Sequence, residues 1–340
     1  MLGGQTALLE TRPVVDAWAS AVCKKEGEGP LGDLFDMIHT DDTMGEDNWE
    51  KAETRLFMDA VKRCIEKAGV TSGDVRMLLG GDLLNQLVAS NFAGRELGIP
   101  FIGLFGACST MAESLAVGAM ILESGSADRL LCAASSHFCT AERQFRFPLE
   151  MGTQRPPSAQ WTVTGAGAVM VSNRRTVLRP RPVITHVTIG KPIDLGVTDA
   201  TNMGAAMAPA AADTLCRHLM DTSRTPTDYD VIATGDLGAV GSALFEELMR
   251  EKGMPLLAHR HVDCGLMIFS PEQDVHSGGS GCGCSASVLC ADLLPKVQKG
   301  KIGRLLFMAT GALMSPVSAN EGESIPSIAH AVVIERPEEV

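Results

Sequence analysis

Cys108 is the residue best suited to chemistry, because it precedes an apolar segment in the motif Phe105-Gly-Ala-Cys-Ser-Thr110. Thr110 and Glu113 have the spacing of a capping box, which predicts a helix over 111–123 with Cys108 just before its first turn. Unpaired backbone N–H groups and the positive end of the helix dipole would then face the sulfur and favour the thiolate. A packed core cysteine is the alternative interpretation, but the capping pattern favours a site.

A second motif with cysteines lies far downstream, at His276-Ser-Gly-Gly-Ser-Gly-Cys-Gly-Cys-Ser285, and predicts another buried helix. His276, Cys282 and Cys284, together with Cys264, contain the atoms of a zinc site. The Cys-x-Cys interval is not the usual zinc spacing, however, and these cysteines can serve as small residues that permit close packing. The glycines resemble a phosphate-binding loop that lacks its lysine. We therefore expect neither a metal nor another cofactor.

The 340-residue chain has a formal charge of −12 and no cluster of lysine and arginine, which argues against nucleic acid as a partner. Its N-terminus lacks the basic start and apolar run of a signal peptide, and no apolar stretch is long enough to span a bilayer. We therefore expect synthesis in the cytoplasm, with the ten cysteines reduced.

Short apolar runs alternate with helical patterns along the chain, which is typical of a mostly parallel sheet covered on both faces. The apolar runs predict strands at 75–80, 101–105, 127–134 and 165–172, and helices at 85–97 and 111–123.

The same order of motifs occurs twice. Leu78-Leu-Gly-Gly-Asp-Leu83 matches Ile232-Ala-Thr-Gly-Asp-Leu237, Gly106-Ala-Cys-Ser109 matches Cys282-Gly-Cys-Ser285, and Arg129-Leu-Leu matches Arg304-Leu-Leu. Because the matches are in register, they predict an α/β fold of two duplicated halves, residues 1–178 and 179–340. We expect the helices after Cys108 and Cys284 to lie side by side at the centre.

Asp82 and Asp236 occupy matching places in these two halves. Their carboxylates could bind a cation such as calcium, but capping of the turn that follows each residue is favoured. We predict a structural role for both.

A strand ending in Gly-Gly-Asp82, a helix leading to Gly98-Ile-Pro100 and the motif Gly106-Ala-Cys-Ser109 before a small-residue helix resemble the thiolase and ketoacyl synthase superfamily. The resemblance implies a thiolase-like fold, in which two halves form one five-layered α-β-α-β-α unit with a nucleophilic cysteine at a central helix. It also implies that active members draw histidine, asparagine or a second cysteine from the second half to hold the oxyanion and move protons.

The second half of this chain departs from that pattern. The segment expected to carry a His-Gly motif is Ala233-Thr-Gly-Asp-Leu237, and the expected Gly-Asn motif is Gly281-Cys-Gly-Cys284. These departures imply a degenerate site without catalysis. One alternative is an acyltransferase or condensing enzyme in which Cys108 is the nucleophile and His276 and Cys282 replace the missing groups. Another is a scaffold whose pocket is vestigial and whose surface docks membrane proteins.

Six motifs in order narrow the resemblance over essentially the whole chain. They are Asp82-Leu-Leu-Asn-Gln86, Phe105-Gly-Ala-Cys-Ser-Thr110, Thr140-Ala-Glu-Arg-Gln-Phe-Arg146, Met207-Ala-Pro-Ala-Ala-Ala-Asp-Thr214, Gly278-Gly-Ser-Gly-Cys282 and Ala309-Thr-Gly-Ala-Leu313. Together they resemble the stage V sporulation protein AD family of endospore-forming bacteria. The resemblance implies binding of dipicolinic acid, free or as its calcium chelate, and its uptake into the developing spore with integral-membrane partners. It also implies a homodimer, peripheral association with the spore inner membrane and no condensing activity.

Dipicolinate carries two carboxylates beside an aromatic nitrogen, so its receptor needs positive charge, backbone donors and an apolar slot. His137 follows a predicted strand, at the place where open α/β sheets bind ligands. We expect segment 138–160 to be a loop near the pocket, in which Arg143 and Arg146 either contact the ligand or pair with neighbouring glutamates. The predicted ligand-binding residues are Cys108, Ser109, Ser136, His137, Arg143, Arg146, Asn85 and Cys282.

Overall fold

The computed structural model describes residues 2–145, 155–177, 180–257 and 259–336. The strands of the first half are β2 (Val14–Val22), β4 (Leu78–Gly81), β5 (Phe101–Gly103), β6 (Arg129–Ser136) and β8 (Gly165–Ser172). Their counterparts in the second half are β9 (Val183–Thr188), β10 (Val231–Thr234), β11 (His261–Asp263), β13 (Arg304–Ala312) and β14 (Ser327–Glu335). The four predicted strands correspond to β4, β5, β6 and β8.

The two halves repeat one strand order. The first half runs β5-β4-β6-β8-β2 and the second runs β11-β10-β13-β14-β9. In each half the fourth strand, β8 or β14, is antiparallel to both of its neighbours, and the first three strands are parallel. This shared topology confirms the duplication expected from the sequence repeat.

The two halves meet where Val14 of β2 pairs with Val183 of β9. Two short strands extend this central region, because β1 (Thr6–Leu8) pairs with β9 and β3 (Met37–Ile38) pairs with β2. The boundary predicted between residues 178 and 179 lies outside the described residues.

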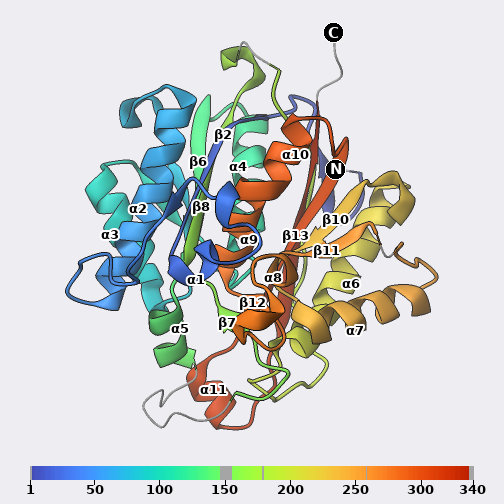
Figure 1. Ribbon diagram of the computed structural model, residues 1–340. Helices are drawn as coiled ribbons and strands as arrows, with labels where there is room; N and C mark the ends of the chain where they lie inside the picture. Colours follow the sequence, from blue (N-terminus) through green and yellow to red (C-terminus); the bar gives the residue numbers. More distant parts are fainter. Residues whose placement is uncertain (1, 146–154, 178–179, 258, 337–340) are drawn as a thin grey trace.

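Helices complete five layers (Figure 1). Helices α2 (Trp49–Ala68) and α3 (Val88–Leu97) cover the outer face of the first half, and α6 (Met203–Thr222) and α7 (Gly238–Glu251) cover the second. Between the halves lie α4 (Thr110–Glu123) and α9 (Cys282–Val288), which contact each other. Because α4 touches β6 on one side and β13 and β14 on the other, the fold is the predicted α-β-α-β-α unit.

The remaining named helices and strands are short. They are α1 (Lys24–Gly27), α5 (Phe138–Phe145), α8 (Cys264–Met267), α10 (Leu294–Gln298), α11 (Pro316–Asn320), β7 (Trp161–Thr162) and β12 (Gly279–Ser280). The loop predicted from residue 138 is wrong as far as residue 145, where the chain is helical. Phe138, Ala141 and Phe145 recur at helical spacing, and α5 packs against β7.

Small residues let α9 lie directly on β8. A Cβ atom on Gly283 would come 2.2 Å from the carbonyl oxygen of Gly165, and one on Gly167 would come 2.3 Å from that of Ala286. Every residue of α9 is buried, including Cys282 and Cys284. This packing confirms the interpretation of the two cysteines as small residues in a crowded centre.

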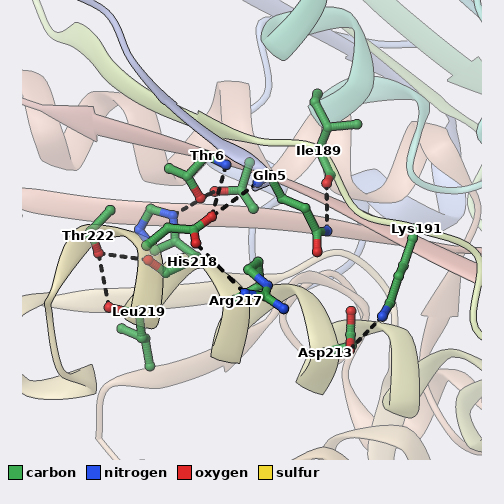
Figure 2. Close-up of polar contacts among 11 residues, drawn as sticks. Gln5, Thr6, Ile189, Lys191, Asp213, Arg217, His218, Leu219 and Thr222 are labelled. Carbon is green, nitrogen blue, oxygen red and sulfur yellow. Dashed lines mark hydrogen bonds and ion pairs between the residues drawn. The ribbon is translucent and has the colours of Figure 1, made fainter. Parts of the chain in front are cut away.

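A buried polar chain holds the N-terminal strand to the second half (Figure 2). The hydroxyls of Thr6 and Thr188 lie 3.0 Å apart, and Nδ1 of His218 lies 2.7 Å from the Thr188 hydroxyl. The carboxylate of Asp221 accepts hydrogen bonds from the backbone N–H groups of Gln5 and Thr6. Burial lowers the pKa of His218 to about 3, so this histidine is neutral in the folded protein.

His218 should make the protein sensitive to acid. Its pKa is depressed in the folded state, so its stabilising contribution is complete above the unfolded pKa near 6.5 and is lost as the pH falls toward 3. Between pH 7 and pH 5 this residue alone should lower the free energy of unfolding by about 2 kcal/mol. Urea unfolding at both pH values measures the loss, which should be smaller by that amount in His218→Gln. An equal loss in both proteins would contradict the assignment.

Candidate functional site

Cys108 sits on a sharp turn between β5 and α4. Ala107 has a left-handed backbone with φ of 50°, an unfavourable conformation for a residue with a side chain. The Ser109 hydroxyl donates to the Gly106 carbonyl at 2.6 Å, and the Thr110 hydroxyl donates to the Ala107 carbonyl at 2.7 Å. These two hydrogen bonds fix the turn that places Cys108 just before the helix, as predicted.

The predicted capping box is wrong. Ser109 occupies the N-cap position and makes no side-chain cap, because its hydroxyl is turned back to the preceding carbonyl. The carboxyl of Glu113 has one oxygen buried without a hydrogen-bond partner among the described residues. Burial raises the pKa of Glu113 to about 7.

The Cys108 sulfur is a thiol, which overturns the predicted thiolate. Its side chain is 5% exposed, and the carboxyl of Asp236 lies near enough to act on the sulfur electrostatically. Burial first, and then the charge of Asp236, raise the pKa of Cys108 well above its usual range. The N–H of Gly281 acts in the opposite direction but is outweighed.

Asp236 is the residue whose contacts the sequence predicted wrongly. Its Oδ2 accepts from the Gly281 N–H at 2.9 Å and from the Ser280 hydroxyl at 3.3 Å, and its Oδ1 accepts from the Thr310 hydroxyl at 3.0 Å. Burial raises the pKa of Asp236 to about 7. The predicted capping of the next turn is wrong for Asp236. The sequence feature that could have identified Asp236 is its position in the segment where the superfamily resemblance predicts a histidine.

The two matching aspartates therefore differ. Asp82 does cap the turn that follows it, because its carboxylate accepts from the N–H groups of Leu84 and Ser90, each at 2.8 Å. In the second half Asp263 takes that task, accepting from the N–H groups of Leu237 and Gly238 at 2.8 and 3.0 Å. Asp236 therefore caps no turn, and its carboxyl lies near Cys108 instead.

A cavity of about 30 Å³ adjoins Cys108. This is close to the volume of one water molecule in the liquid. Of the predicted ligand-binding residues that are described, only Cys108 lines it, and no described lysine, arginine or histidine does. The lining residues are Leu83, Ala107, Cys108, Ala141, Glu142, Phe145, Thr162, Met203, Ser280, Ala312 and Met314.

His137 makes structural hydrogen bonds and does not line this cavity. It is fully buried, its Nε2 donates to the Asp42 carbonyl at 2.9 Å, and its Nδ1 accepts from the Cys139 N–H at 3.1 Å. Burial lowers the pKa of His137, so it is neutral and supplies no positive charge.

Ser136 and Cys282 join the two halves. The Ser136 hydroxyl donates to the Val163 carbonyl at 2.7 Å and accepts from the Gly283 N–H at 3.1 Å. The Cys282 thiol donates to the Ser135 carbonyl at 2.8 Å. Both residues are buried, Ser136 at the end of β6 and Cys282 at the start of α9, and their hydrogen bonds attach α9 to β6.

Two further predicted ligand-binding residues lie on the surface. Asn85 and Arg143 are exposed, and Asn85 exchanges hydrogen bonds with Gln144 of α5 at 3.2 Å. Arg146 lies outside the described residues. His276, the proposed catalytic substitute, is directed to the Pro156 carbonyl at 2.8 Å and to Asp274 at 3.2 Å, and does not line the Cys108 cavity.

Another buried carboxyl was missed altogether. Glu53 of α2 is fully buried and accepts hydrogen bonds from the hydroxyls of Ser135 and Thr140 at 3.1 and 2.6 Å. Burial raises the pKa of Glu53 to about 8, and the charge of nearby Asp82 adds to the shift. No sequence signal marks it, because a glutamate in a charged helix is normally exposed.

Within the described ranges, no group of three or more His, Cys, Asp and Glu side chains is arranged to hold a metal ion. In that same part of the chain, no helix is both long and apolar enough to cross a bilayer.

Asp236→Asn should increase the reactivity of Cys108. Removing the negative charge lowers the thiol pKa, and one pKa unit corresponds to about tenfold more thiolate. Alkylation by a small reagent at pH 8, followed peptide by peptide in a mass spectrometer, should be at least about tenfold faster at Cys108. The half-exposed Cys139 is the internal control and should not change. In the unmodified protein, faster alkylation of Cys108 than of Cys139 would restore the thiolate hypothesis.

Comparisons with solved structures place the fold. Human mitochondrial 3-ketoacyl-CoA thiolase matches with a TM-score of 0.62 and 13% identity, over 98% of this chain and 100% of that one. The 3-oxoacyl-[acyl-carrier-protein] synthase III of Aquifex aeolicus VF5 matches with a TM-score of 0.56 and 12% identity, over 95% and 99% of the two chains. At such identities the likeness shows the thiolase-like fold alone.

Sequence comparisons show the family. The model of the stage V sporulation protein AD family matches residues 3–335. Stage V sporulation protein AD of Bacillus subtilis (strain 168) is 46% identical over 336 residues, which cover 99% of this chain and 98% of that protein. The chain, with its thiolase-like fold and its buried Cys108–Asp236 pair, therefore belongs to the stage V sporulation protein AD family.

Proposed function

We propose that the protein binds dipicolinic acid (pyridine-2,6-dicarboxylic acid), free or as its calcium chelate, and serves its uptake into the developing spore without catalysing a reaction. It would act beside integral-membrane partners at the spore inner membrane. Membership of a family of sporulation proteins supports a role in the developing spore. The pairing of Cys108 with Asp236 carries the proposal, because a condensing enzyme needs an accessible thiolate and a proton shuttle at that place.

Three features of the site favour binding over acyl transfer. The Cys108 thiol is held protonated. The Gly281 N–H, a donor at the start of α9, already donates to Asp236 and is not available to an oxyanion. The described lining of the cavity contains no histidine. Loss of a single oxyanion donor costs about 10²–10³ in rate, so the combined loss supports a silent site.

The cavity must widen to admit an aromatic dicarboxylate. Phe145, Met203 and Met314 line it, and methionine side chains change shape at little cost. We place one carboxylate toward the backbone N–H groups at the start of α4, where a helix favours an anion. The acidic lining residue Glu142 then disfavours a second charge inside the cavity, so the other carboxylate points outward.

Filling the cavity should abolish this binding. We expect Ala312→Leu to weaken dipicolinate affinity by about tenfold or more, because the added side chain occupies the ligand's space. Cys108→Ala should leave affinity within a few-fold, because the backbone donors survive. Titration calorimetry measures both, and Met203→Trp is a second filling variant should Ala312→Leu fold poorly. Undiminished binding in both filling variants would place the ligand elsewhere.

A mass measurement separates binding from catalysis. The protein incubated with acetyl-CoA or acetoacetyl-CoA should gain no acyl group on Cys108 and release no free CoA. Acylation or turnover that disappears in Cys108→Ala would establish the enzyme alternative in place of this proposal.

We also propose that the protein is a homodimer joined through β5. This strand is the edge of the first half, so one row of its backbone groups has no strand partner among the residues that the structure describes. Ile102 on β5 is 43% exposed, and Phe105 just after it is 48% exposed. An apolar edge strand favours pairing with a second copy.

Ile102→Lys should convert the dimer to a monomer, because two lysines would face each other across the twofold axis. Light scattering at micromolar concentration measures the mass. Leu195→Lys, another exposed apolar site at 69% exposure, is the matched control and should remain dimeric. A monomeric unmodified protein would refute the homodimer.

A further inference from the structure

The Cys108 cavity shares a wall with a larger cavity. This second cavity, of about 410 Å³, lies around the turn that joins β13 to α11, and we call it the outer hollow. Its wall combines apolar side chains, such as Leu313 and Ile325, with serine hydroxyls and two carboxylates. Among the described residues Met314 alone lines both spaces, so its side chain forms the partition between them.

The two cavities differ in what they can hold. The Cys108 cavity, of about 30 Å³, has room for one water molecule. A buried cavity of about 150 Å³ can hold a benzene ring, and sites for small molecules typically measure about 300–1,000 Å³. A small molecule can therefore occupy the outer hollow as it stands. It can contact the Cys108 sulfur only after a side chain of the inner wall has moved.

Met314 is the wall residue best suited to move. It lies between the end of β13 at Ala312 and the start of α11 at Pro316, outside any helix or strand. Its side chain is unbranched and has three rotatable bonds. By contrast, Ala141 and Thr162 of the same inner wall belong to α5 and β7. Rotation of the Met314 side chain would join the two cavities without displacing a helix or a strand.

Hydrogen bonds hold the wall of the outer hollow in place. The Leu313 N–H donates to the Pro326 carbonyl at 2.8 Å, and the Ile325 N–H donates to the Val197 carbonyl at 2.8 Å. The Ser324 hydroxyl donates to the carboxylate of Asp194 at 2.6 Å. These contacts tie segment 323–326 to the end of β13 and to the loop over 194–197. The outer hollow is therefore a preformed feature of the fold.

The outer hollow is acidic. Asp194 and Glu323 line it and are exposed, and no described lysine, arginine or histidine lines it. Water and salt screen exposed carboxylates, so these two acids repel an anion weakly and do not exclude it. The outer hollow consequently favours a neutral small molecule over an anion of the same size.

A competing route passes Phe145 and Met203, the two residues of the Cys108 lining that are only partly buried. Phe145 belongs to α5, and Met203 is the first residue of α6. Neither residue lines the outer hollow. The two routes therefore make opposite predictions for truncation of Met203 and of Met314.

We propose that small molecules reach Cys108 through the outer hollow and that Met314 closes this route. A molecule first occupies the outer hollow, Met314 then turns aside, and the joined cavities bring the molecule to the sulfur. This inference goes beyond the proposed function, because it concerns access to Cys108 and holds for any small molecule that fits the hollow.

Alkylation of Cys108 by iodoacetamide, a small neutral reagent, tests the route. A conformer that lies a few kcal/mol higher is populated at about 0.1–10%, so a permanently open route should speed alkylation by about tenfold or more. We expect this gain in Met314→Ala, measured peptide by peptide in a mass spectrometer. The dependence of the rate on pH should keep its midpoint, because no charge changes. Cys139, which lines neither cavity, is the internal control.

Met203→Ala is the matched control, because it truncates a methionine of the inner wall that does not line the outer hollow. Its rate of Cys108 alkylation should change little. Adding Ser318→Trp to Met314→Ala should fill the outer hollow and restore slow alkylation, and Ala319→Trp is a second filling variant. Thermal unfolding shows whether each variant is folded.

Two results would overturn the route. One is a gain in Met203→Ala that equals or exceeds the gain in Met314→Ala, which would place the entrance beside Phe145. The other is fast alkylation that persists in both filled variants. Failure of the unmodified protein to bind dipicolinate would refute the proposed function but not the route, because alkylation of Cys108 is measured without that ligand.

Discussion

Close burial of α4 and α9 between the two halves is the constraint on which the rest of the structure depends. Glycines allow α9 to approach β8 so closely that a Cβ at Gly283 would lie 2.2 Å from a carbonyl oxygen. Everything at the start of these helices is consequently withdrawn from water. Desolvation disfavours every charged form, and it outweighs the helix dipole at Cys108. Burial in this fold therefore keeps Cys108 a thiol.

Hydrogen bonds from hydroxyl groups reduce the free-energy cost of burying the carboxyl groups. Thr310 and Ser280 donate to Asp236, and Ser135 and Thr140 donate to Glu53. Such hydrogen bonds compensate part of the cost of burying a carboxyl, and the raised pKa values show that burial still dominates. A centre of this kind suits the holding of a ligand and its protons better than the generation of a nucleophile.

Duplication supplied two equivalent positions, and the two halves use them differently. Asp82 keeps the task of capping the turn after β4, whereas Asp263 has taken that task after β10. Asp236 is thereby released to the centre. The short pairing of β7 with β12 has no counterpart in the strand order repeated by the two halves, and Thr162 of β7 and Ser280 of β12 line the Cys108 cavity. The proposed binding function therefore depends on the features in which the halves differ.

The sequence by itself determined the architecture. Apolar periodicity located strands such as β8 and helices such as α4, and the in-register repeat predicted two equivalent halves with adjacent central helices, because these patterns record which faces are buried. Motifs also located the turn at Cys108. Tertiary structure alone decided the chemistry, because protonation depends on burial and on neighbours distant in sequence. Asp236 lies 128 positions after Cys108 in the chain, His137 is made neutral by burial and donates to the carbonyl of Asp42, and Trp161 contacts cations from α1 and from residue 155. No local pattern encodes such contacts, so the thiolate, the capping box and the roles of Asp236 and His137 could be judged only once the chain was folded.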